Sequence, residues 1–209
     1  MNYKNKKRLQ IINYIVSQLN GENGYMKEFL IKMVYLADKL FLLRYGATIT
    51  SDSFLAFERG TACSETLAIM NLDKEHIEDE DDQVVKTFKN TYNFNFTPST
   101  KNVHTLFING KLNNNFSTLS KAEMETMDII INAFGNKSYD EISEYTHQFK
   151  EWQPFKDKFN DCGANKYCSV DMKDVFEDRT FMHHEELKKY ISEESIQNAI
   201  DFYNGDYCD

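Results

Sequence analysis

The segment KMVYLADKLFLLRYGATITSDSFLAFERG, from Lys32 to Gly60, decides how the first part of this chain is expected to fold. Apolar residues at spacings of three and four predict a helix over residues 26–45, and Gly46 follows where a left-handed cap belongs. The run TITSD predicts a turn, because Thr, Ser and Asp side chains hydrogen-bond nearby backbone groups. The alternation in SFLAFE predicts a short strand. The segment contains no phosphate loop, no metal motif and no paired nucleophile and base.

Two capping boxes and several helical patterns extend this prediction along the chain. In LSKAE the Ser120 hydroxyl and the Glu123 carboxylate can each bind the other's backbone amide, and SYDE repeats the pattern at Ser138 and Glu141. Each box predicts the start of a helix. The remaining predicted helices cover residues 5–20, 64–72, 170–176, 183–191 and 192–203, with a loop at residues 161–169.

The sheet is predicted from aromatic alternation. In the run KTFKNTYNFNFT, at residues 86–97, four aromatic residues share one parity and would face the core from a half-buried strand. These residues are Phe88, Tyr92, Phe94 and Phe96. The run NVHTLFIN is the expected partner strand. The predicted fold class is α+β and mainly α-helical, with helices packed around a small antiparallel sheet built from parts of 52–58, 86–97 and 102–109.

Composition narrows the classes of function. The 209 residues carry a formal net charge of −9, which argues against direct nucleic acid binding because phosphate contacts come from Lys and Arg. An acidic charge suits either a basic partner or solubility alone. Residues 73–82 contain seven acids, and they predict either a solvated loop or a docking patch for such a partner.

Several features indicate the compartment. No apolar run reaches the roughly 18 residues of a membrane span, and the N-terminal stretch is too polar for a signal peptide. We therefore expect a cytoplasmic protein that does not enter a membrane. Its cysteines are then expected to be free thiols. They are Cys63, Cys162, Cys168 and Cys208.

The residue types that could support catalysis form no recognisable arrangement. The Cys and His spacings match no compact zinc motif, so neither a metal nor a cofactor is expected. His147 lies near the end of a predicted helix, where the helix dipole favours a histidine, and just before Trp152. As a general base it would need a nucleophile or a water, and a third group such as Asp38 or Asp52. Nothing in the sequence requires such an arrangement.

The segment Lys32–Gly60, followed by a capped helix, a Thr-His pair and a Trp, resembles the Panacea-domain antitoxins, a SocA-like family also described as phage-associated and GepA-like. The chain departs from the family after the strand, where ERGTACSE replaces the usual Gly-Pro-Val. Phe54 stands where the family often has tyrosine. The first set of matching positions is Tyr35, Leu36, Asp38, Tyr45, Gly46, Ile49, Thr50, Asp52, Ala56 and Gly60. The second set is Ser120, Glu123, Gly135, Tyr139, Thr146, His147 and Trp152.

The resemblance implies an antitoxin-type binding protein, not an enzyme, that neutralises a cognate toxin encoded nearby by direct protein–protein interaction. The alternatives are an adaptor that delivers its target to a protease, a phage or mobile-element inhibitor of a host factor, and a small hydrolase that uses His147. The antitoxin domain would cover residues 1–176, and residues 177–209 would form a helical extension packed on or beside it. The candidate partner-binding or family-signature residues are Tyr35, Asp38, Tyr45, Thr50, Asp52, Phe54, Gly60, His147 and Trp152.

The partner surface is expected outside the matched signatures. The acidic residues at 73–82 would steer a basic toxin toward the protein. The last predicted helix would add apolar anchors on one face. The alternative is that this helix packs on the protein's own core. The expected anchors are Ile196, Ile200, Phe202 and Tyr203.

Overall fold

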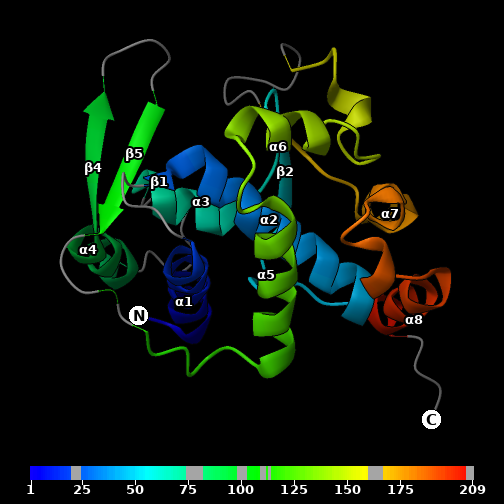
Figure 1. Ribbon diagram of the computed structural model, residues 1–209, viewed down its shortest axis with the longest axis horizontal. Helices are drawn as coiled ribbons and strands as arrows, with labels where there is room; N and C mark the ends of the chain where they lie inside the picture. Colours follow the sequence, from blue (N-terminus) through cyan, green and yellow to red (C-terminus); the bar gives the residue numbers. More distant parts are fainter. Residues whose placement is uncertain are drawn as a thin grey trace.

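The computed structural model describes residues 1–19, 25–73, 82–97, 103–108, 112, 114–159 and 167–205. Helix α2 (Lys27–Tyr45) lies in the middle of the molecule, with other helices on several sides of it (Figure 1). Most of its residues are buried, as expected for a helix that is apolar almost all round. It ends at Gly46, whose backbone is left-handed at φ 72° and whose amide donates to the Leu42 carbonyl oxygen. The predicted helix and its cap are confirmed.

Three of the other α-helices start at capping boxes. Ser120 and Ser138 form the two predicted capping boxes, and Ser192 with Ser195 forms a third that was not predicted. None of the helices in the described part of the chain has both the length and the apolar character needed to cross a membrane. These helices are α1 (Tyr3–Gln18), α3 (Ser64–Asn71), α4 (Asp82–Thr91), α5 (Lys121–Phe134), α6 (Tyr139–Thr146), α7 (Met172–Glu177) and α8 (Glu193–Asn204).

The strands form two small antiparallel sheets. The first has the order β1-β5-β4, with Phe94 of β4 opposite Leu106 of β5. The second has the order β3-β2-β6, with Ala56 of β2 opposite both Thr61 and Cys168. The strands are β1 (Tyr25–Met26), β2 (Phe54–Phe57), β3 (Gly60–Cys63), β4 (Tyr92–Thr97), β5 (Val103–Ile108) and β6 (Tyr167–Ser169).

The mainly helical α+β class is confirmed, but the predicted strand pairing is wrong in one respect. The 52–58 segment does not join the strands at 92–97 and 103–108. It forms a hairpin with Gly60–Cys63 instead, and β6 covers its other edge. With β3 on one edge and β6 on the other, β2 has no free edge for the strands at 92–97 and 103–108.

The predicted strand over residues 86–97 is half wrong, because α4 continues to Thr91 before β4 begins. One face of this helix is buried, and it carries Val84, Val85 and Phe88. Their helical spacing explains why the first half of the run is a helix and not a strand. The Phe88 and Tyr92 rings still meet, with centroids 4.8 Å apart. The alternation of aromatic residues continues across the helix–strand boundary, so it overstates the length of the strand.

Three smaller predictions near the C-terminus also need correction. The expected loop at 161–169 contains strand β6 in its described part. The expected helix at 183–191 is replaced by two short 3-10 turns, η4 (Thr180–His183) and η5 (Lys188–Tyr190). Phe181 of η4 and Leu187, just before η5, are buried without forming a continuous stripe. Cys168 is disulfide-bonded, so the expectation of free thiols is wrong there, whereas Cys63 is a buried free thiol.

Helix α8 packs against the C-terminal end of α2. Ile196 and Ala199 are buried there. A Cβ atom placed on Gly46 would lie only 2.5 Å from the Ala199 carbonyl oxygen. The last helix therefore sits directly on the cap of the central helix, and the core extends into residues well beyond 176.

Candidate functional site

Asp38 organises the turn that follows α2. Its carboxylate is buried, and Oδ1 accepts from the backbone amides of Ile49 at 2.6 Å and Thr50 at 3.0 Å. Oδ2 accepts from the Thr50 hydroxyl and from the Cys63 Sγ, the latter at 3.3 Å. Burial raises the pKa of Asp38 to about 6, although the Thr50 hydrogen bonds oppose the rise. Since this pKa is still below 7, the carboxylate is mostly ionised at neutral pH. It accepts hydrogen bonds from backbone amides of the turn that would otherwise be buried without a partner.

Asp52 joins this turn to two helices. Its Oδ1 accepts from Arg8 Nε of α1 at 2.6 Å, and its Oδ2 accepts from the Thr66 amide in the first turn of α3 at 2.7 Å. The Asp52 amide donates to the Thr50 hydroxyl oxygen at 3.0 Å. Burial raises the pKa of Asp52, and the Arg8 guanidinium acts against that rise. Asp52 therefore caps α3 and compensates a buried arginine.

A second buried charge cluster centres on Lys39 of α2. Its ammonium lies 2.6 Å from Glu151 Oε1 and 3.0 Å from Asp178 Oδ2, and all three side chains are withdrawn from water. The Tyr35 hydroxyl, one helical turn earlier, donates to the same Glu151 oxygen. The ammonium also sits 3.6 Å from the centroid of the Phe149 ring. We call Tyr35, Lys39, Glu151 and Asp178 the Lys39 cluster.

Sequence reasoning missed three members of the Lys39 cluster. The available signal was a lysine on an otherwise apolar face of α2, four residues after Tyr35, because a buried cation needs a compensating partner. Its partners could not be identified from spacing. Burial acts to raise the pKa of Asp178, but Lys39 and hydrogen bonds from Lys150 and Thr180 outweigh it, so the pKa is lowered. The ionised carboxylate thus stabilises the buried ammonium.

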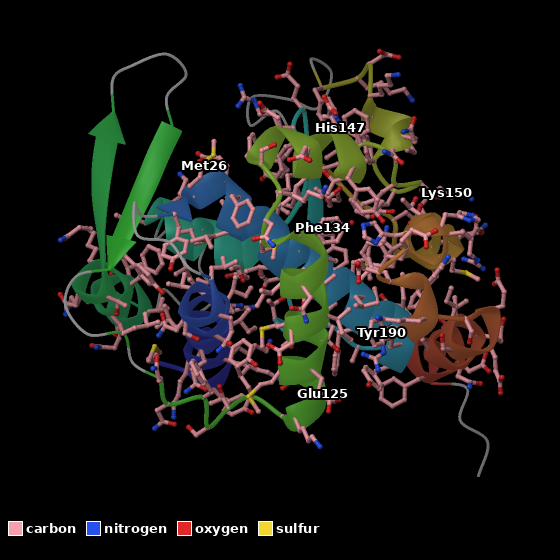
Figure 2. All side chains as sticks on the ribbon, viewed as in Figure 1. Met26, Glu125, Phe134, His147, Lys150 and Tyr190 are labelled. Atoms are coloured by element: carbon pink, nitrogen blue, oxygen red, sulfur yellow. The ribbon has the colours of Figure 1, made fainter. Side chains whose placement is uncertain are left out.

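His147, labelled in Figure 2, lies with Trp152 beside the β2–β3 hairpin. Their rings stack with centroids 4.1 Å apart, and Trp152 Nε1 donates to the Phe57 carbonyl oxygen at 2.8 Å. His147 Nε2 is buried and has no hydrogen-bond partner among the described residues. Burial lowers the pKa of His147, and the nearby Lys32 ammonium lowers it further. The imidazole is therefore neutral at physiological pH, and it is held by stacking.

Gly60 allows the hairpin to approach the helices closely. Its φ of +97° suits only glycine, and a Cβ there would lie 2.5 Å from both Lys32 Nζ and Thr146 Oγ1. Lys32 Nζ donates to the Thr61 carbonyl oxygen at 3.0 Å and so fixes the hairpin on α2. The glycine is required by the fold at this point, whatever the function.

The nine candidate residues divide by exposure. Tyr45 is 38% exposed at the end of α2, where its ring packs on Phe41 with centroids 4.6 Å apart, and His147 is half-buried. The other seven are buried, so they offer no side-chain surface to a partner in this state. They are Tyr35, Asp38, Thr50, Asp52, Phe54, Gly60 and Trp152.

The region that these residues organise is also the region that a family model matches. The model is the antitoxin SocA-like family, Panacea domain, and it matches residues 30–153. The chain belongs to this family. Comparisons with curated proteins and with solved structures gave no match. Arg8 and Asp178, which complete the two charge clusters of this Panacea domain, lie outside the matched residues.

Lys32 gives the Panacea domain a testable pH dependence. Burial lowers its pKa from 10.5 to about 7. Between these values the unfolded chain binds the proton and the native chain does not, so this group makes the free energy of unfolding rise with pH. We expect Lys32→Met to raise that free energy by about 1–3 kcal/mol at pH 7, because the desolvation cost of the ammonium exceeds one hydrogen bond.

Urea denaturation at several pH values would measure this effect. The advantage of Lys32→Met over the wild type should shrink by about 2 kcal/mol between pH 7 and pH 9. The difference between the two proteins isolates Lys32, because every other group titrates in both. Lys173→Met, at an exposed lysine of α7, is the matched control and should show no such trend. A constant difference across this range would contradict the assignment.

Proposed function

We propose that this chain is an antitoxin that neutralises a cognate toxin, encoded nearby, by direct protein–protein contact. Membership of the SocA-like antitoxin family is the observation that carries the proposal. The buried positions of seven signature residues support a division of labour in which these residues hold the framework and other residues contact the toxin. A rigid framework lowers the entropic cost of ordering a contact surface on binding.

The geometry around His147 favours a binding protein over a hydrolase. A hydrolytic site would need His147 to be oriented by Asp38 or Asp52, and both carboxylates are already engaged by other donors. The groups that raise the pKa of His147 are the Glu58 backbone and Glu144. In the described ranges, no group of three or more Cys, His, Asp or Glu residues is arranged to hold a metal ion.

We propose that part of the toxin contact surface lies where α8 meets the end of α2. Tyr45 and Tyr203 are 38% and 48% exposed there, and Phe202 is 51% exposed. Exposed aromatic residues are over-represented in protein interfaces. Ile196, which was expected to be an anchor, is buried against the core instead. The acidic patch expected at residues 73–82 lies almost entirely outside the described residues, and its role stays part of this proposal.

Co-expression with the product of the neighbouring gene tests the proposed function. We expect that product to arrest growth alone, and the wild-type chain to restore growth and to co-purify with it. The double variant Tyr45→Ala/Tyr203→Ala should weaken binding at least tenfold, because central aromatic residues often dominate interface energy. Tyr3→Ala is the matched control, since Tyr3 is 65% exposed at the start of α1.

Each outcome separates the alternatives. A neighbouring product without toxicity would overturn the antitoxin proposal and favour an inhibitor of a host factor. Restored growth with a shortened toxin half-life, measured after blocking synthesis, would favour an adaptor that delivers the toxin to a protease. Restored growth with a stable complex fits neutralisation by binding alone. Equal binding by the double variant and the Tyr3→Ala control would overturn the proposed contact surface while leaving the function intact.

A further inference from the structure

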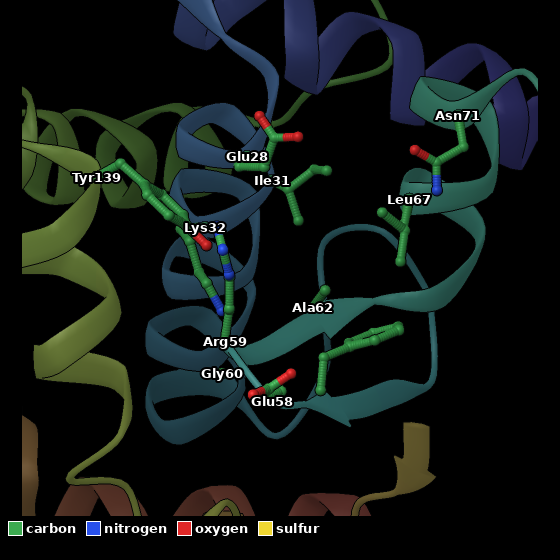
Figure 3. A pocket seen from close by; sticks show the side chains of 11 residues that line it. Glu28, Ile31, Lys32, Glu58, Arg59, Gly60, Ala62, Leu67, Asn71 and Tyr139 are labelled. Atoms are coloured by element: carbon green, nitrogen blue, oxygen red, sulfur yellow. The ribbon is translucent and has the colours of Figure 1, made fainter. Parts of the chain in front are cut away.

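A pocket of about 350 Å³ opens between α2, the β2–β3 hairpin and α3 (Figure 3). It lies near the start of α2, at the opposite end of that helix from Gly46 and α8. Gly46 lies 14 residues after Lys32, the pocket residue of α2 nearest to it, which is roughly 21 Å of helix. The pocket is therefore a second surface, distinct from the aromatic one on α8.

The floor of the pocket is apolar. It is lined by Ile31 of α2, Phe57 of β2, Ala62 of β3 and Leu67 of α3. Figure 3 shows Ile31, Ala62 and Leu67 around one hollow. The volume exceeds that of one aliphatic or aromatic side chain. Apolar hollows with a few polar groups at the rim are typical of sites that hold one anchoring side chain of a partner.

The rim carries charges of both signs, and the positive ones already have partners. Lys32 donates to the Thr61 carbonyl oxygen at 3.0 Å, and the Arg59 guanidinium acts to lower the pKa of the neighbouring Tyr139. Glu28 differs, because its Oε2 is buried and has no hydrogen-bond partner among the described residues. Because Glu28 lines the pocket, a donor that enters the pocket would pair with this carboxylate.

From this arrangement we propose that the pocket binds a protein segment that places an aliphatic or aromatic side chain next to a lysine or arginine. The apolar side chain fills the hollow over Ile31 and Leu67. The cationic group pairs with Glu28 at the rim. The net charge of −9 favours the approach of such a segment over an acidic one. The inference deepens the proposed function, because it rests on the partner being a protein and assigns the chemistry of the segment that is bound.

A peptide library displayed on phage and selected against the folded full-length chain tests the pocket without the toxin. We expect the selected peptides to combine an aliphatic or aromatic residue with a Lys or Arg no more than two positions away. Glu28→Gln should lower the affinity of a selected peptide about tenfold, because it removes the charge that the cation pairs with. Leu67→Arg should abolish binding, since it places a competing guanidinium in the hollow.

Glu125→Gln is the matched control, because Glu125 is exposed on α5 (Figure 2) and does not line the pocket. Its affinity should equal that of the wild type. Thermal melting of each variant shows whether it is folded. If Leu67→Arg does not fold, Glu28→Gln still tests the inference. Selected peptides that lack a cation, or that bind Glu28→Gln as tightly as wild type, would overturn the inference. Failure of growth rescue with intact peptide binding would overturn only the proposed antitoxin function.

Discussion

Replacement of Lys39 by methionine is expected to lower the free energy of unfolding by about 3–5 kcal/mol. The variant would leave the carboxylates of Glu151 and Asp178 buried near each other, without the ammonium that lies 2.6 Å and 3.0 Å from them. Two buried carboxylates without a counter-ion repel each other and are also desolvated. Urea denaturation at pH 7 would measure the loss.

Two further variants show whether charge compensation is the cause. Lys173→Met removes an exposed lysine, 3.7 Å from Glu177, and should change stability by less than about 0.5 kcal/mol. Adding Glu151→Gln and Asp178→Asn to Lys39→Met removes the two uncompensated carboxylate charges and keeps the side-chain shapes. The triple variant should recover at least half of the loss. A small effect of Lys39→Met alone would mean that the Lys39 cluster contributes little to stability.

The second large effect is expected at Gly46. Gly46→Ala should lower the free energy of unfolding by about 2–4 kcal/mol, through left-handed strain and overpacking together. The φ is +72°, and the new Cβ would lie 2.5 Å from the Ala199 carbonyl oxygen and 2.8 Å from the Phe202 ring. Since backbone cannot move aside as a flexible side chain can, α8 should shift away from α2. Thermal melting and limited proteolysis of α8 would detect both changes.

Gly205→Ala is a matched control for this variant. Gly205 also caps a helix with a left-handed backbone, at φ +75°, but no atom of the described residues lies within 4 Å of a Cβ placed there. This substitution should cost only the backbone strain, about 1–2 kcal/mol. The difference between the two glycines measures the contact between α8 and α2. Equal losses would show that α8 is not held at Gly46.

The parts of the fold that were predicted correctly depend on local sequence. Helix α2 and its Gly46 cap, and the boxes at Ser120 and Ser138, require only contacts between residues a few positions apart. The strand pairing failed because it depends on distant residues: β2 pairs with β6, more than a hundred positions later. Aromatic alternation in residues 86–97 was ambiguous, since Phe88 and Tyr92 are also four apart and suit a helix equally well.

For the candidate site, too, the sequence predicted some residues but not their long-range contacts. The resemblance identified Asp38 and Asp52, and both lie at the centre of hydrogen-bond networks. It could not indicate that their side chains are buried, or that Arg8 compensates Asp52 from another helix. The partners of Lys39 could not be predicted for the same reason. A lysine in an apolar stripe indicates that a carboxylate is needed, but it does not identify which one.

The wide sequence spacing of the Lys39 cluster has a consequence for synthesis on the ribosome. Lys39 is translated 112 positions before Glu151, and Asp178 comes later still. At 5–20 residues per second the lysine waits roughly 6–22 s for its first counter-ion. During that interval the central helix cannot bury the ammonium, and its apolar surface stays open to chaperones and proteases. We therefore expect a nascent chain that stalls before Asp178 to be degraded more readily than the completed chain.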